Sequence, residues 1–282
     1  MNHQAHSPVE WSMTDQEFDA LRQAIHEFAG IVIGPEKRSM IRSRLRRRFV
    51  ALQLSSLTDY LYLIRQPDGS AERQNFISSL TTNVTSFFRE QHHFDLLINQ
   101  ILPPERNGYA RLNIWSAGCS SGQEPYSIAL AIHDKRPDLV HGTKILATDI
   151  DHGILEQAKA RVYARKDVEG LPPTMLSRYF QSIRQDDAEA EEMRLSSSVS
   201  NMVTFRQLNL NTNWIMPRQF DAIFCRNVAI YFDQQAQKRL WQRFLGVLRP
   251  GGWLLIGHSE RIQPELHDML RPGGMTAYQK AP

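Results

Sequence analysis

The chain has 282 residues and a formal net charge of +3, from 33 Lys and Arg against 30 Asp and Glu. Hydrophobic residues make up 41%, which is ordinary for a globular protein and excludes a disordered chain. No apolar run approaches the roughly 18 residues of a membrane span, and the N-terminus lacks the basic-then-apolar pattern of a signal peptide. Two cysteines exclude a disulfide framework and a four-cysteine zinc site, so we expect a cytoplasmic protein without membrane insertion.

The N-terminal part, residues 1–78, is predicted to be helical. Thr14 and Glu17 have the spacing of a capping box, and apolar residues follow at helical intervals. A second helix, over residues 36–52, combines one apolar stripe with a dense set of basic residues. We expect the stripe to pack inward and the arginines to face solvent. These arginines are Arg38, Arg42, Arg44, Arg46, Arg47 and Arg48.

From about residue 107 short apolar runs alternate with helical ones, which predicts an α/β domain with a parallel sheet covered on both faces. The predicted strands are 112–118, 143–151, 203–210, 220–228 and 253–260, and the predicted helices are 126–135, 152–163 and 233–248. Residues 275–281 could add an edge strand. Residues 177–203 interrupt this rhythm and are expected to form a small insertion or hairpin, while residues 79–106 join the two parts.

A glycine-rich turn, SAGCSSG, follows the first predicted strand and leads into a helix. Its spacing from Gly118 to Gly122 is neither the dinucleotide fingerprint nor a phosphate-binding P-loop. The free N–H groups at the start of a helix favour a carboxylate, and Glu124 could hold an ammonium group. An amino acid moiety has both groups. The alternative is a plain tight turn, with Glu124 as a favourable charge at the helix start.

Polar side chains also follow the later strands, where ligands of open parallel sheets bind. Asp149 is predicted to accept hydrogen bonds from ribose hydroxyls, and Asp151 to cap the next helix. Asn209 and Asn227 could bind an adenine edge or a ribose, or only satisfy their loops. Together these features favour a nucleoside that carries an amino acid, which describes S-adenosylmethionine.

Four stretches, SAGCSSGQEPYS, TTNVTSFFRE, ATDID and FCRNVAIYF, together resemble the chemotaxis receptor glutamate methyltransferases, the CheR family. GHSE at residues 257–260 resembles that family too, and the similarity runs over nearly the whole chain. It implies an α/β, Rossmann-like methyltransferase domain over residues 107–282 that depends on S-adenosylmethionine. It also implies a small inserted β-subdomain at about 177–203 and an all-α domain in front.

The resemblance further implies which residues form the site. Arg89 and Tyr231 occupy motif positions near the transferred methyl group and would be catalytic. The residues implied to bind the cofactor, which leaves as S-adenosylhomocysteine, are Asn83, Thr85, Arg89, Gly118, Glu124, Asp149, Asn209, Leu210, Asn227 and Val228.

The implied reaction esterifies a glutamate side chain with the methyl group. Because glutamate has a pKa near 4.3, it is already an anion at neutral pH and needs no general base. We expect Arg89 to steer this carboxylate and Tyr231 to position it by a hydrogen bond. Cys119 is not expected to act as a nucleophile, since no histidine partner is apparent. No metal is expected, because the adjacent His92 and His93 have no third ligand in view.

The implied substrate is the cytoplasmic methylation region of chemoreceptors, whose acidic helical surface could dock on the six arginines of the basic helix. Nucleic acid is the rival partner, without a recognition motif to support it, and a solvated helix face is the plain alternative. The region SIRQDDAEAEEMRL lacks the glycine-rich loop with which some members tether a receptor pentapeptide, so we expect recognition without tethering, by a monomer. The remaining alternatives are a methyltransferase for another substrate class and a non-catalytic module that binds the cofactor.

Overall fold

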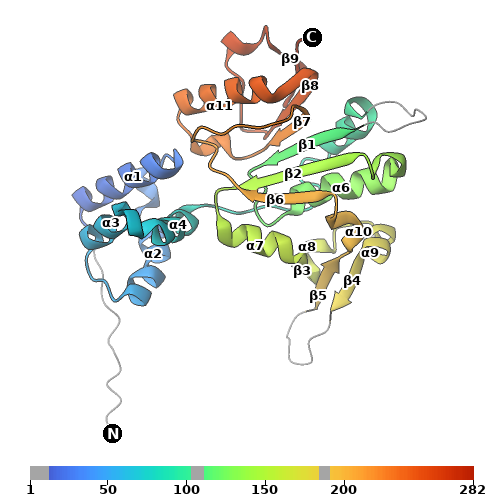
Figure 1. Cartoon of the computed structure of the whole chain (residues 1–282). Helices are drawn as coiled ribbons and strands as arrows, with labels where there is room; N and C mark the ends of the chain where they lie inside the picture. Colours follow the sequence, from blue (N-terminus) through green and yellow to red (C-terminus); the bar gives the residue numbers. More distant parts are fainter. Residues whose placement is uncertain (1–12, 103–110, 184–190) are drawn as a thin grey trace. The chain divides into compact units, whose positions relative to one another are not determined.

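The computed structural model describes residues 13–102, 111–183 and 191–282. The chain divides into two compact units, Met1–Thr82 and Asn83–Pro282 (Figure 1). Within the described ranges, no helix is long and apolar enough to span a bilayer.

The smaller unit is all-α, as predicted. Its helices are α1 (Asp15–Ala29), α2 (Arg38–Leu52), α3 (Leu57–Arg65) and α4 (Ser70–Leu80), with 3-10 turns at Pro35–Lys37 and Pro67–Gly69. The capping box of Thr14 and Glu17 is present, which confirms that prediction. The predicted stripe of α2, Ile41, Leu45 and Phe49, is buried.

The larger unit contains a seven-stranded sheet in the order β6-β2-β1-β7-β8-β10-β9. Its first five strands are parallel, as the alternation of strands and helices predicts. They are β6 (Val203–Gln207), β2 (Thr143–Asp149), β1 (Leu112–Ala117), β7 (Phe220–Cys225) and β8 (Leu248–Ile256).

The antiparallel end of the sheet differs from the prediction. The run at 275–281 contains β10 (Ala277–Lys280), which lies between β8 and the edge strand β9 (Leu270–Gly274) and is therefore not an edge. The sequence LRPGG of β9 looks like a turn, because Pro and Gly are poor strand formers. An edge strand tolerates them, since Pro272 has no ladder N–H to donate. A side chain at Gly273 would meet Trp253 at 2.5 Å.

Helices cover both faces of this sheet (Figure 1). One core cluster joins Ile114 of β1 to α6 (Gln123–Lys135), α7 (His152–Ala160) and α5 (His92–Leu96), which continues into a π-helical turn at Leu97–Ile101. The other joins Trp115 to α11 (Gln234–Val247). Ile114 and Trp115 belong to opposite clusters because successive side chains of a strand point to opposite faces.

A small second sheet has the order β3-β5-β4, all antiparallel. The predicted insertion at 177–203 contains β4 (Phe180–Ile183), β5 (Glu192–Leu195) and the short α10 (Ser197–Ser200). However, β3 (Val162–Ala164), α8 (Arg165–Val168) and most of α9 (Pro173–Tyr179) precede that range. Part of the glycine-free stretch, residues 184–190, lies outside the described residues.

Candidate active site

The loops at the carboxyl ends of β1 and β7 contact each other at the glycine turn. Gly118 has a φ of +89°, and a Cβ there would lie 2.2 Å from Cγ2 of Val228. Gly122, with a φ of +91°, is the residue before α6, and a Cβ there would lie 3.0 Å from that of Ala158. Both positions require glycine, for backbone conformation and for space. The predicted tight turn therefore brings two predicted site residues, Gly118 and Val228, together.

Glu124, on the first turn of α6, lies beside a buried cation. Its Oε1 accepts a hydrogen bond from Oγ of Ser116 at 2.6 Å, and its Oε2 is 3.3 Å from Nη1 of Arg226. Both side chains are almost fully buried, at 12% and 2% exposure. Burial raises the pKa of Glu124, and the charge of Arg226 opposes this shift only in part. An amino acid moiety, with one charge of each sign, fits this pair of opposite charges.

Asp149, at the end of β2, ties the glycine turn to its neighbour strand. One carboxylate oxygen accepts the N–H of Ser120 at 2.8 Å and the other accepts the N–H of Asp151 at 3.1 Å. Burial raises the pKa of Asp149, and these hydrogen bonds lower it in part. A carboxylate oxygen has more than one lone pair, so each can still accept a hydroxyl hydrogen. The donor set therefore also fits a ribose.

Asp151 caps α7 by accepting the N–H groups of Gly153 and Ile154, at 2.9 and 3.3 Å. This confirms the predicted cap. Its other carboxylate oxygen accepts a hydrogen bond from Nδ2 of Asn83 at 3.1 Å, and Oγ of Ser120 donates to the carbonyl of Asn83 at 3.0 Å. Asn83 thus lies at the carboxyl ends of β1 and β2, as does Asp149.

Arg89 lies between two non-glycine residues with left-handed backbone, Phe88 (φ +51°) and Glu90 (φ +57°). Such backbone is costly and persists where neighbouring contacts hold it. Here the N–H of Phe88 donates to Oγ of Ser127 at 2.9 Å, and a guanidinium nitrogen of Arg226 donates to the carbonyl of Arg89. The side chain of Arg89 is partly exposed and donates to the carbonyl of Val84 at 3.1 Å. Thr85, on the same segment, is also partly exposed.

The loop after β6 lies beside Asp149, because the N–H of Leu208 donates to the carbonyl of Asp149 at 2.9 Å. Asn209 and Leu210 follow directly. Oδ1 of Asn209 accepts the N–H of Asn211 at 2.9 Å, and the side chain of Leu210 is buried.

The loop after β7 contains Asn227, Val228 and Tyr231, the last at the end of a 3-10 turn, Ala229–Tyr231. Asn227 has a left-handed backbone (φ +58°), and the side chain of Tyr231 is partly exposed. The N–H of Tyr231 donates to the carbonyl of Val228 at 3.2 Å, which holds the turn. Arg89 and Tyr231 are thus both presented on loops at the carboxyl ends of the strands.

Sequence reasoning missed two charged residues of this region, Arg226 and Glu260. Arg226 contacts Glu124 and the carbonyl of Arg89, and Glu260 binds the loop after β7. Each is a buried charge just after a strand that ends in buried apolar residues: Arg226 directly follows β7, and Glu260 lies four residues after β8. Their place after the strands could have identified them, since buried charges there need a partner.

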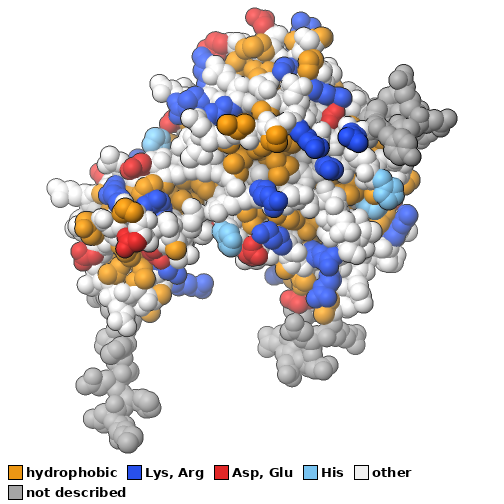
Figure 2. Space-filling view, in the orientation of Figure 1, with side chains coloured by type: hydrophobic (Ala, Val, Ile, Leu, Met, Phe, Trp, Pro, Cys, Tyr) orange, Lys and Arg blue, Asp and Glu red, His pale blue; other side chains and the backbone are white. Residues whose placement is uncertain are grey.

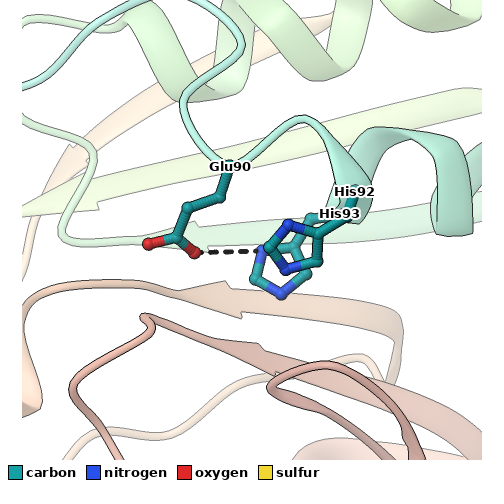
Figure 3. A group of neighbouring side chains, drawn as sticks. All are labelled: Glu90, His92 and His93. Carbon is teal, nitrogen blue, oxygen red and sulfur yellow. Dashed lines mark ion pairs between the residues drawn. The ribbon is translucent and has the colours of Figure 1, made fainter.

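A cluster of Glu90, His92 and His93 corrects the expectation that the two histidines have no third ligand. One possible ligand atom of each lies within 4.8 Å of the others (Figure 3). However, Nε of Arg226 is 3.5 Å from Oε2 of Glu90, so its positive charge opposes a metal ion there. His93 also uses Nε2 for Oγ1 of Thr276, at 3.0 Å. The cluster is better described as part of the polar network that surrounds Arg226.

The thiol of Cys119 is buried in the glycine turn. Burial, together with the nearby carboxylates of Asp149 and Glu124, raises its pKa well above the usual range. A thiol held neutral in this way is a poor nucleophile.

On α2, three of the six arginines that were expected to face solvent are only partly exposed and make contacts within the helical unit. Arg48 lies three residues after Leu45 on the buried side and forms an ion pair with Glu72, to which its Nε donates at 2.9 Å. Arg44 donates to the carbonyl of Thr81 at 2.8 Å, and Arg38 pairs with Asp15. The other three of the six are exposed. They are Arg42, Arg46 and Arg47.

The sequence matches two family models: the CheR methyltransferase, SAM binding domain over residues 83–278, and the CheR methyltransferase, all-alpha domain over residues 16–81. It is 40% identical over 268 residues to the chemotaxis protein methyltransferase of Escherichia coli, covering 95% of this chain and 91% of that protein. The chemotaxis protein methyltransferase of Klebsiella aerogenes is 40% identical over 268 residues, with 94% and 90% covered. Chemotaxis protein methyltransferase 2 of Pseudomonas aeruginosa is 38% identical over 281 residues, with 98% of both chains covered.

Proposed function

The chain belongs to the CheR methyltransferase family, and we propose that it transfers a methyl group from S-adenosylmethionine to glutamate side chains of chemoreceptors. This modification would adapt chemotaxis signalling, and the enzyme would act in the cytoplasm as a monomer. The observation that carries the proposal is similarity over the full length: both family domains are present, and relatives named chemotaxis protein methyltransferases are 38% to 40% identical.

The cofactor would be held by the loops at the carboxyl ends of the strands. Glu124 would bind the methionine ammonium and Asp149 the ribose hydroxyls, each from the position described above. The remaining residues that we propose to line the cofactor are Asn83, Thr85, Arg89, Gly118, Asn209, Leu210, Asn227 and Val228. When bound, S-adenosylmethionine supplies a methyl group on a positively charged sulfur.

For the reaction itself the chain has to align a carboxylate that is already ionised at neutral pH. Alignment of the reacting atoms and removal of water from the anion account for most of the acceleration in such a transfer. We assign Arg89 to steer the carboxylate by its charge and Tyr231 to position it by a hydrogen bond from its hydroxyl. Both side chains are partly exposed, as groups that meet a protein substrate must be.

The receptor would be recognised by its charge. Arg42, Arg46 and Arg47 form an exposed basic face on α2, and basic side chains also spread over the visible face of the larger unit, where acidic ones are sparse (Figure 2). Such surfaces attract an acidic protein region. Since the insertion lacks the glycine-rich loop, we propose that binding does not need a receptor pentapeptide. Tight binding of such a peptide would overturn this part.

The proposal is tested with methyl-labelled S-adenosylmethionine and two receptor cytoplasmic fragments, one with glutamates at the methylation positions and one with glutamines there. Only the glutamate fragment should take up label, because an amide oxygen is a far weaker nucleophile than a carboxylate. Equal labelling of both fragments would contradict carboxyl methylation. If the enzyme binds the cofactor but labels no member of a panel of receptor fragments, the non-catalytic alternative holds instead.

A further inference from the structure

We infer that Glu260 is a positioning residue that holds the loop after β7, and with it Asn227, Val228 and Tyr231, in the geometry needed for cofactor binding and methyl transfer. The inference goes beyond the proposed function, because it concerns what shapes the site rather than which substrate is used. It rests on that function only where turnover is measured.

The carboxylate of Glu260 accepts hydrogen bonds from four consecutive backbone N–H groups of this loop. Oε1 accepts from Val228 at 2.9 Å, Ala229 at 2.7 Å and Ile230 at 3.3 Å, and Oε2 accepts from Asn227 at 3.1 Å. A short turn leaves such groups without partners of its own, and buried N–H groups need one. The turn that presents Tyr231 is therefore built around the carboxylate.

A neutral amide cannot satisfy these donors as the carboxylate does. The side chain of Glu260 is buried, at 4% exposure, and its Oε2 also accepts the N–H of Gly257 at 2.5 Å. In glutamine one of the two oxygens becomes an NH2 group, which donates and cannot accept. Either orientation of the amide would then set a donor against at least two backbone donors.

The same short segment, Gly257 to Glu260, also contacts the segment that contains Arg89. The ring Nδ1 of His258 is 2.9 Å from Oε1 of Glu90, whose carboxylate also accepts the backbone N–H of His258 at 3.3 Å. A Cβ at Gly257 would lie 2.7 Å from the backbone nitrogen of Asn227, so the segment fits closely against the loop. The loop after β8 thus links the two segments that carry Arg89 and Tyr231, and Glu260 makes most of its bonds.

A buried carboxylate at the amino end of β7, far from the loop that Glu260 holds, provides a matched control. Asp221, in β7, is also buried, accepts the N–H of Asn113 at 2.7 Å and pairs with Arg249 at 2.8 Å. Because it lies near the amino end of β7, its loss should weaken the fold without touching the site. It therefore separates an effect on stability from an effect on the geometry of the site.

The experiment compares full-length wild type, Glu260→Gln, Glu260→Asp and Asp221→Asn. For each we would measure the Tm, the Kd of S-adenosylhomocysteine by calorimetry and, with a receptor fragment, kcat and KM for the receptor. We expect Glu260→Gln to weaken cofactor binding and lower kcat by about tenfold or more, as displacements of about 1 Å do, with the receptor KM little changed. Asp221→Asn should lower the Tm about as much as Glu260→Gln does. It should change the Kd of S-adenosylhomocysteine and kcat by no more than about twofold. Glu260→Asp, which keeps the charge, should recover part of the affinity.

The inference is overturned if folded Glu260→Gln binds S-adenosylhomocysteine with a Kd within about twofold of the wild-type value. It is also overturned if Asp221→Asn, at the same loss of Tm, raises that Kd as much as Glu260→Gln does. If Glu260→Gln does not fold, Gly257→Ala decides, because its Cβ presses on the backbone of Asn227 while the carboxylate stays. A folded Gly257→Ala with unchanged affinity overturns the inference, and a weakened affinity supports it. Cofactor binding needs no receptor, so failure to methylate receptors would leave this test intact.

Discussion

At the scale of single residues, Arg226 is the buried cation that joins three parts of the site. Its guanidinium lies 3.3 Å from Glu124 and 3.5 Å from Glu90, and it donates to the backbone carbonyl of Arg89. Because a guanidinium has five N–H donors in a fixed planar fork, it can contact several parts of the site at once. It connects α6, the loop after β7 and the segment that carries Arg89.

Arg89 is proposed both to line the cofactor and to steer the carboxylate, and we expect the steering role to dominate when its side chain is removed. We expect Arg89→Ala to lower kcat for receptor methylation at least about tenfold, since a charged group that aligns the nucleophile is lost. The Kd of S-adenosylhomocysteine should change much less. Kinetics and calorimetry on the same preparation measure both, with Arg111→Ala, an exposed arginine before β1, as the control. Unchanged turnover would remove Arg89 from the mechanism.

At this scale, the sequence predicts roles that depend on neighbouring residues better than roles that depend on a partner distant in the chain. The cap by Asp151 follows from a local pattern and is confirmed. Arg226 and Glu260 were not identified, because their partners lie more than thirty residues away or on other loops. Asp149 and Glu124 follow strand ends as predicted, but their contacts with Ser120 and Arg226 could be known only from the fold.

At the scale of elements, α2 is held to α4 by a buried polar cluster. The carboxylate of Glu72 forms an ion pair with Arg48 and accepts from the hydroxyl of Tyr60 at 2.8 Å. Burial raises the pKa of Glu72, but the hydrogen bonds outweigh it, so the net pKa lies below its usual range. The carboxylate is thus stabilised in its ionised form.

Arg48→Ala should therefore destabilise the helical unit by about 1–3 kcal/mol, because it leaves a buried carboxylate without its cation. Its neighbour Arg47 is exposed, and Arg47→Ala should change the free energy of unfolding by less than about 0.5 kcal/mol. Urea unfolding of the two full-length variants, followed by circular dichroism, makes the comparison. Equal losses for both would show that Arg48 is only a surface residue.

The helix α5 is anchored to the turn between β9 and β10 by a buried histidine. Nε2 of His93 is within hydrogen-bond distance of the carbonyl of Met275 and Oγ1 of Thr276, at 3.2 and 3.0 Å. Burial, the charge of Arg226 and that of His92 lower the pKa of His93 from 6.5 to about 4. The folded protein therefore binds this proton less readily than the unfolded chain.

Because the folded pKa is depressed, the contribution of His93 to stability is complete above about pH 6.5 and is lost as the pH falls toward 4. The loss is on the order of 3 kcal/mol for a shift of this size. His93→Gln cannot titrate, so its stability should fall less steeply over this range. Urea midpoints between pH 7 and pH 4.5 would show this, with His141→Gln as an exposed control. Parallel pH profiles for His93→Gln and wild type would contradict the assignment.

Strands and helices with a strong apolar pattern were predicted from sequence, and two short strands were not. The predicted helix at 152–163 ends at Ala160, because Arg161 adopts a left-handed conformation (φ +52°) and the chain continues as β3. Without a glycine, this helix end has no sequence signal. β9 was also missed, since its pairing with β10 depends on tertiary contacts that outweigh the poor strand propensity of its Pro and Gly.

At the scale of the whole molecule, the two structural units and the two family matches divide the chain at nearly the same place, between Thr82 and Asn83 for the units and between residues 81 and 83 for the matches. The sequence-based boundaries were 78 and 107. The segment after Asn83 belongs to the larger unit through its contacts with Asp151, Ser120 and Arg226. The Thr/Ser-rich sequence of this segment, TTNVTSFF, does not predict these contacts, so the boundary could not be placed from sequence.

The proposed charge-based recognition concerns the full protein and its receptor. Replacing Arg42, Arg46 and Arg47 together by alanine should lower kcat/KM for the receptor by about tenfold at low salt, through KM, with kcat unchanged. The difference should shrink as salt is raised, because screening weakens attraction between exposed charges. The control replaces two exposed arginines elsewhere, Arg65 and Arg271. An effect that does not depend on salt would exclude steering by charge.

The most direct measurement asks which bond the enzyme makes. Purified full-length protein, methyl-labelled S-adenosylmethionine and a glutamate-bearing receptor fragment are incubated together, and the labelled fragment is then treated with mild alkali. A methyl ester is hydrolysed by alkali, so the account predicts that the label is released as methanol. Label that stays on the fragment after alkali would mean methylation of nitrogen or another stable position, and it would contradict glutamate methylation by this chain.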